Sequence, residues 1–151
     1  MAKNTIKLKK YVDIINEYKA GGVITSGMLV AVNSVGAVIA HAVAGGVCSK
    51  MFALEDELQG RTIKDNFVSG EPVQCWVTVP GEEVNALLAD GEDVAIGEVL
   101  VSDGAGKLKV ATPNASAVII EQYPIAIALE AVNMTGSAGV DPSGRIKVRI
   151  L

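Results

Sequence analysis

Apolar and polar residues alternate along this chain in short runs that glycines interrupt, a pattern that predicts strands joined by tight turns. Two apolar runs, residues 28–32 and 37–43, flank the turn-forming residues Asn33, Ser34 and Gly36 and predict a hairpin. In the last run Arg145, Lys147 and Arg149 alternate with Ile146, Val148 and Ile150. Further strands are expected at 72–79, 94–101, 107–111, 117–121 and 125–132.

Three glycines recur at one offset of 70 residues: Gly21, Gly27 and Gly36 match Gly91, Gly97 and Gly106. Residues 52–55 also resemble residues 127–130 at an offset of 75. Spaced self-similarity of this kind indicates a doubled structural unit. The predicted fold is therefore mainly β, a compact β-barrel or β-sandwich with an internal duplication.

Two segments do not have a clear strand pattern. Val84, Leu87 and Leu88 stand at helical spacing within residues 82–89, although an extended conformation fits nearly as well. Tyr11, Ile14, Ile15 and Tyr18 share one face of a helix within residues 10–19. We expect a short helix at each place.

The composition suits one domain of 151 residues, in which 50% of residues are apolar and only 4% aromatic. This apolar content exceeds what a monomer of this size needs, so we expect a homo-oligomer. Residues 20–49 carry no charge, but glycines divide them into runs that suit strands, and no membrane span is expected. The lysine-rich N-terminus lacks a secretory pattern, which predicts synthesis and use in the cytosol.

Residues suited to catalysis are few. Cys48 and Cys75 favour free buried thiols over a disulfide or a zinc site, because no second pair accompanies them. The single histidine, His41, falls in an apolar strand, which favours a core or interface imidazole over a general base. The acidic run 55–57 favours a solvated face over a cation site, since successive side chains diverge. We expect no enzymatic activity, no cofactor and no metal.

Charge is distributed unevenly behind a net value of −4. Residues 1–10 hold four lysines and residues 145–151 hold three basic groups, whereas residues 11–144 hold all 17 acids. An acidic body with basic ends does not suit nucleic-acid binding, which needs a broad basic surface. The lysines are either solvated positions or part of an N-terminal arm, residues 1–20, that leaves the body and lies on an acidic neighbour.

Residues 90–100 resemble the glycine-containing hammerhead of lipoyl and biotinyl carrier domains, in which a lysine of a following hairpin carries the cofactor. The departures are that Glu92 replaces the aspartate of that motif, and that Lys107 and Lys109 lack the usual flanking residues. A carrier domain of barrel-sandwich type is the alternative function.

Segments 5–11, 22–30, 51–60, 83–91 and 139–146 together resemble the head decoration, or cement, proteins of tailed bacteriophages. The resemblance covers nearly the whole chain. It implies a small β-rich protein that binds as a homotrimer to the outer surface of the phage head in the virion, after synthesis in the bacterial host cytoplasm. It implies that neighbouring subunits of the major capsid protein are tied together after expansion, without enzymatic activity or cofactor.

On this interpretation residues 21–151 form the decoration domain and the arm contacts the capsid. The contacting residues would be Lys3, Ile6, Lys7, Leu8, Lys9, Lys10 and Tyr11. Deleting residues 1–10 is then expected to abolish head binding while leaving a folded oligomer.

Overall fold

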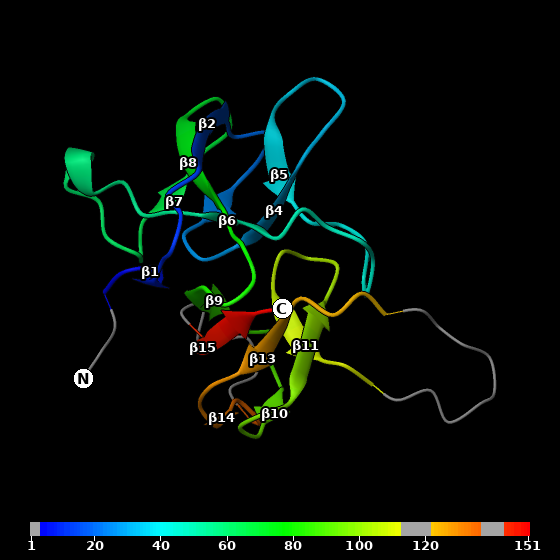
Figure 1. Ribbon diagram of the computed structural model, residues 1–151. Helices are drawn as coiled ribbons and strands as arrows, with labels where there is room; N and C mark the ends of the chain where they lie inside the picture. Colours follow the sequence, from blue (N-terminus) through cyan, green and yellow to red (C-terminus); the bar gives the residue numbers. More distant parts are fainter. Residues whose placement is uncertain (1–3, 113–121, 137–143) are drawn as a thin grey trace.

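The computed structural model describes residues 4–112, 122–136 and 144–151, and nearly all of its regular structure is short β-strands (Figure 1). The single helical turn in this described part is η1 (Glu57–Gln59). The predicted strand at 117–121 lies outside the described residues. The strands are β1 (Lys7–Lys9), β2 (Ile15–Lys19), β3 (Ile24–Thr25), β4 (Leu29–Val32), β5 (Val38–Ala40), β6 (Met51–Ala53), β7 (Asn66–Phe67), β8 (Pro72–Val77), β9 (Glu83–Leu87), β10 (Asp93–Val94), β11 (Val99–Ser102), β12 (Leu108–Val110), β13 (Ala126–Ala128), β14 (Val132–Asn133) and β15 (Arg145–Ile150).

The strands form two large antiparallel sheets and two small ribbons. The first half of the chain builds a five-stranded sheet in the order β2-β8-β6-β4-β5, with the ribbon β3-β7. The second half builds the order β9-β15-β13-β11-β12, which β1 extends to six strands, with the ribbon β10-β14. In Figure 1 the first sheet lies above the second. The mainly β prediction is confirmed, as packed sheets and not as a closed barrel.

The internal duplication is confirmed strand by strand. Apart from β1, the two large sheets have the same strand order. The hairpin pair Val30↔Ala40 recurs as Leu100↔Val110 at the predicted offset of 70. An isolated parallel bridge, Ala20↔Val38, recurs as Leu88↔Leu108. We call residues 15–77 repeat 1 and residues 83–150 repeat 2.

The two repeats share a hydrophobic core. Its main cluster combines the fully buried Phe52 and Trp76 of repeat 1 with Leu100 and Ile146 of repeat 2. A second cluster lies in repeat 1 and includes Leu87 of repeat 2. Since each repeat completes the core of the other, they form one folding unit and not two domains.

Both predicted helices are wrong, because each segment is a strand. Residues 15–19 form β2, which pairs with β8 along its whole length. Residues 83–87 form β9, whose five residues are all buried between β1 and β15. A short apolar run fits either period, and the hydrogen bonds that neighbouring strands offer decide the conformation.

The uncharged stretch 20–49 holds β3, β4 and β5. In the part of the chain that the structure describes, no helix has the length and apolar character to cross a membrane.

The prediction of an arm that leaves the body is wrong for residues 5–20. In that segment β1 joins the sheet of repeat 2, and β2 is an edge strand of the sheet of repeat 1. The proposed boundary at residue 20 therefore does not separate an arm from a domain. The physical reason is that this segment supplies strand pairing and apolar burial that both sheets lack without it.

Candidate binding surface at the N-terminal segment

The N-terminal segment is held in the fold by its backbone and by one apolar side chain. Ile6 is fully buried and belongs to the main core cluster. Its carbonyl oxygen accepts the Asn85 N–H at 2.9 Å, and β1 then pairs with β9 through Lys7↔Val84 and Lys9↔Glu83. Because the Ile6 side chain has no exposed surface, the capsid contact predicted for it has no support from this geometry.

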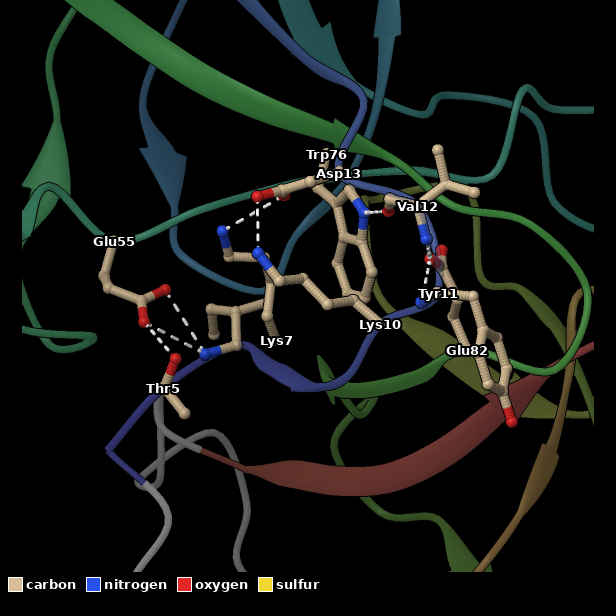
Figure 2. Close-up of polar contacts among 10 residues, drawn as sticks. Thr5, Lys7, Lys10, Tyr11, Val12, Asp13, Glu55, Trp76 and Glu82 are labelled. Carbon is tan, nitrogen blue, oxygen red and sulfur yellow. Dashed lines mark hydrogen bonds and ion pairs between the residues drawn. The ribbon is translucent and has the colours of Figure 1, made fainter.

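Two buried carboxylates fix the segment on either side of β1 (Figure 2). Glu55 accepts the Thr5 hydroxyl and, at 3.2 Å to each oxygen, the Ile6 N–H. Glu82, with no exposed surface, accepts the N–H groups of Tyr11 at 2.9 Å and Val12 at 3.0 Å. These charge-assisted hydrogen bonds offset the cost of burying a carboxylate.

The acidic run 55–57 is thus not one solvated face. Glu55 is buried, Asp56 accepts the Gln59 N–H at 3.3 Å as the cap of η1, and Glu57 is exposed. Among the described residues, no group of three or more histidine, cysteine or acidic side chains could hold a metal ion.

The remaining predicted contact residues lie at different depths. Lys3 falls outside the described residues, and Leu8 is half-buried. Lys7 and Lys10 both pair with Asp13, at 3.4 and 2.5 Å. The hydrogen bond from Lys10 is the main cause that lowers the pKa of Asp13. The ammonium group of Lys9 lies 5.5 Å from the ring centre of the exposed Tyr11.

The basic residues at the two ends of the chain meet on one sheet, because β9 lies between β1 and β15. Glu83 of β9 pairs with Lys147 at 2.9 Å and Arg149 at 3.3 Å, and Lys9 is opposite it on β1. The Lys147 hydrogen bond is the main cause that lowers the pKa of Glu83. We call Lys9, Tyr11, Lys147 and Arg149 the basic surface. The sequence indicated both basic ends, but only strand order shows that they adjoin.

His41 is buried, as its apolar strand predicted. Its Nε2 lies 3.1 Å from the Val47 carbonyl oxygen and its Nδ1 lies 2.7 Å from the Ser102 hydroxyl. A carbonyl oxygen can only accept, so Nε2–H donates to Val47 and Nδ1 accepts from Ser102. The imidazole therefore joins the two repeats.

Both cysteines are free thiols, as predicted. Cys75 is fully buried, and burial raises its pKa to about 12. Cys48 is half-buried, and burial is also the main cause that raises its pKa.

The hairpin turn that would carry a cofactor in a carrier domain packs against repeat 1. Gly106 N–H donates to the His41 carbonyl at 3.2 Å, and Lys107 pairs with Asp90 at 3.5 Å. A cofactor-bearing lysine needs a turn that projects freely, so the carrier role stays a prediction without support from this geometry. The hammerhead glycine Gly97, at φ +90°, has a counterpart in Gly27 at φ +87°, which shows that both repeats use the same bend.

No protein-family model matches the chain, and no curated protein sequence matches it either. Among solved structures, the fold is similar to the N base of the head fiber gp8.5 in bacteriophage phi29. The TM-score is 0.56 at 9% sequence identity, and the match covers 93% of this chain and 95% of that chain. At this identity the similarity establishes a shared fold.

Proposed function

We propose that this chain is a structural protein of a phage head. The observation that carries the proposal is the fold similarity to the base of a head fiber, which extends over 93% of this chain and 95% of the other. Because the match extends over nearly the whole of both chains, it indicates that they share one complete architecture and not a common small motif. The segments that resemble head decoration proteins lead to the same class of protein independently.

The proposed role is to bind the outer surface of the head and to tie neighbouring subunits of the major capsid protein together, stabilising the expanded shell. The contact is made by the basic surface and not by a detached arm. Lys9, Lys147 and Arg149 lie around Glu83, and Glu130 accepts the backbone N–H of Lys147 at 2.7 Å, so three positive charges lie beside two carboxylates. The excess of positive charge suits an acidic partner. The exposed Tyr11 adds an aromatic side chain of the kind enriched in interfaces.

A homotrimer would present three basic surfaces to the shell. Contacts that are weak singly then act together, because binding of one subunit raises the effective concentration of the others. The protein would in this way stay on the outer surface of the virion without any large single interface.

The proposal is tested by co-sedimentation with expanded heads prepared without the protein. Wild-type protein is expected to sediment with the heads. The double variant Lys9→Glu, Arg149→Glu is expected to lose at least about tenfold in affinity, since reversed charges face the same partner. Lys64→Glu reverses an exposed lysine outside the basic surface and serves as the matched control.

Absence of wild-type protein from the sedimented heads would overturn the proposed function. Binding of the double variant at wild-type affinity would leave the function standing and show that another surface makes the contact. Substitutions are preferred to deletion of residues 1–10, since the deletion also removes the buried Ile6.

A further inference from the structure

The two repeats contribute non-equivalent surfaces to the contact between them. Repeat 1 contributes Gly27, Leu29 and His41, whereas repeat 2 contributes Leu87 and Gly106. Leu87 N–H donates to the Gly27 carbonyl at 3.0 Å, Leu29 N–H to the Gly106 carbonyl at 2.8 Å, and Gly106 N–H to the His41 carbonyl at 3.2 Å. The duplicated units are therefore joined head to tail.

Each repeat carries equivalents of both surfaces, because the two repeats share one fold. We call the surface around Gly27 and Leu29 the turn face and the surface around Leu87 and Gly106 the edge face. The turn face of repeat 2 consists of the residues equivalent to those of repeat 1, namely Ile96, Gly97, Glu98, Val99 and Ala111. The edge face of repeat 1 consists of Glu17, Lys19, Val32 and Gly36.

These second copies of the two faces are not joined to each other within the chain. A Cβ atom added at Gly106 would lie 2.5 Å from Met28, but one added at its equivalent Gly36 would meet no atom within 4 Å. A Cβ atom added at Gly97 would also meet no atom within 4 Å, whereas one added at its equivalent Gly27 would lie 2.9 Å from the Asn85 carbonyl oxygen. In Figure 1 the hairpin of β4 and β5 and strand β2 lie at the top, whereas β10 lies at the bottom.

Apolar side chains are exposed at positions that the junction buries in the other repeat. Val99 is 38% exposed, whereas its equivalent Leu29 is fully buried. Ile96 is 69% exposed, whereas Ser26 is fully buried. On the edge face Val32 is 45% exposed, and its equivalent Ser102 is fully buried. Burial of these side chains would remove apolar surface from water on both faces.

Backbone groups on the two faces also match. Strand β2 is an edge strand, and the N–H of Ala20, directly after it, donates to the Glu71 carbonyl on the β8 side. Because successive N–H groups along a strand alternate in direction, the N–H of Lys19 is directed away from β8. The equivalent group in repeat 2 is the Leu87 N–H, which bonds to Gly27 across the junction. Of the charged residues, Lys19 on the edge face is opposite in sign to Glu98 on the turn face, and Glu17 on the edge face has the same sign as Glu98.

We infer that copies of this chain associate head to tail, the edge face of repeat 1 in one copy binding the turn face of repeat 2 in the next. The contact repeats the junction within the chain: Lys19 N–H donates to the Gly97 carbonyl, and Val99 N–H donates to the Gly36 carbonyl. A heterologous contact of this kind closes into a ring if its rotation permits and otherwise forms an open chain.

The test is sedimentation velocity over a concentration series with one variant of each face. Val99→Asp places a charge on the turn face and Val32→Asp places one on the edge face, both at exposed positions. Wild-type protein is expected to form oligomers, and each variant alone is expected to weaken association at least about tenfold. Leu58→Asp, at a side chain 91% exposed in η1 and outside both faces, is the matched control.

An equimolar mixture of the two variants gives the decisive result. Each variant keeps one intact face, so the mixture is expected to form a one-to-one heterodimer and nothing larger. A wild-type protein that stays monomeric, variants that associate like the wild type, or a mixture that stays monomeric would each overturn the inference. Near-UV circular dichroism checks that the variants are folded, and no phage heads are used, so the result is independent of the proposed function.

Discussion

Glu82 accepts the backbone N–H of Tyr11 at 2.9 Å, although the two residues are 71 positions apart in the sequence. The same carboxylate accepts the N–H groups of Val12 at 3.0 Å and Val79 at 2.8 Å. One buried side chain thus ties the end of the N-terminal segment to the turn before β9. This relationship explains why a lysine-rich segment that resembles a free arm is part of the body.

Replacing Glu82 by Gln is expected to lower the free energy of unfolding by about 2–3 kcal/mol, because a neutral amide cannot accept all three hydrogen bonds that this buried carboxylate accepts. Urea denaturation measures this loss, and an m-value equal to that of the wild type checks that unfolding remains two-state. Glu98→Gln is the matched control: its Oε2 accepts the Ala95 N–H at 2.8 Å with the same three-residue spacing as Glu82 and Val79, but at the surface. A loss as large in Glu98→Gln would contradict the role of burial.

Ile6→Ala is expected to cost about 2–5 kcal/mol of unfolding free energy, since it removes a buried side chain from the shared core. Leu58→Ala, at an exposed position, is expected to change it by less than about 0.5 kcal/mol. Deleting residues 1–10 removes Ile6 and β1 together. The truncated chain is therefore expected to be destabilised, and a truncated chain with the wild-type urea midpoint would refute the structural role assigned to this segment.

Gly106→Ala and its equivalent Gly36→Ala separate turn strain from packing between repeats. Both glycines have positive φ, +80° and +78°, so each alanine is expected to cost about 1–2 kcal/mol. Only the Gly106 substitution also meets Met28, at 2.5 Å, and overpacking adds about 1–3 kcal/mol. Thermal unfolding of the two variants measures the difference. Equal losses of stability in the two variants would show that close packing between the repeats does not constrain the turn at Gly106.

Arg61 bonds both oxygens of Glu71, at 2.7 and 2.9 Å, and is the main cause that lowers the pKa of Glu71 to about 2. The pair therefore stabilises the fold above the ordinary glutamate pKa, and this contribution is lost as pH falls from about 4.3 toward the folded-state value. Arg61→Gln is expected to raise the pKa of Glu71 in an NMR titration and to reduce the loss of stability over that range. Lys64→Gln, a control without a bond to Glu71, should leave the pKa of Glu71 at its wild-type value.

Most strand-forming runs and the repeat could be predicted because both depend on local sequence. The strands expected at 94–101 and 125–132 are wrong in extent, since each divides into two short strands. A glycine at a fixed position allows the same bend in both halves, as Gly27 and Gly97 do with nearly equal φ. The conformation of residues 83–87 could not be predicted in this way. Their apolar spacing fits a helix, and pairing with β1 and β15 on either side makes them a strand.

The candidate site was predicted in part, since Lys9 and Tyr11 are exposed as expected and Ile6 is not. A lysine-rich segment has the same composition whether it is free or paired, so composition could not show that β1 joins a sheet. The adjacency of Lys9 and Arg149 also has no local signal, because it depends on the position of β9 between their strands.

Sequence alone thus determined the mainly β class, the doubled unit and the buried positions of His41 and Cys75, because hydrophobic periodicity and glycine turns act over a few residues. Tertiary structure alone decided which edge receives β1, which carboxylates are buried and how the repeats are joined. Those features arise from hydrogen bonds and packing between residues far apart in the chain, whose partners no local pattern specifies.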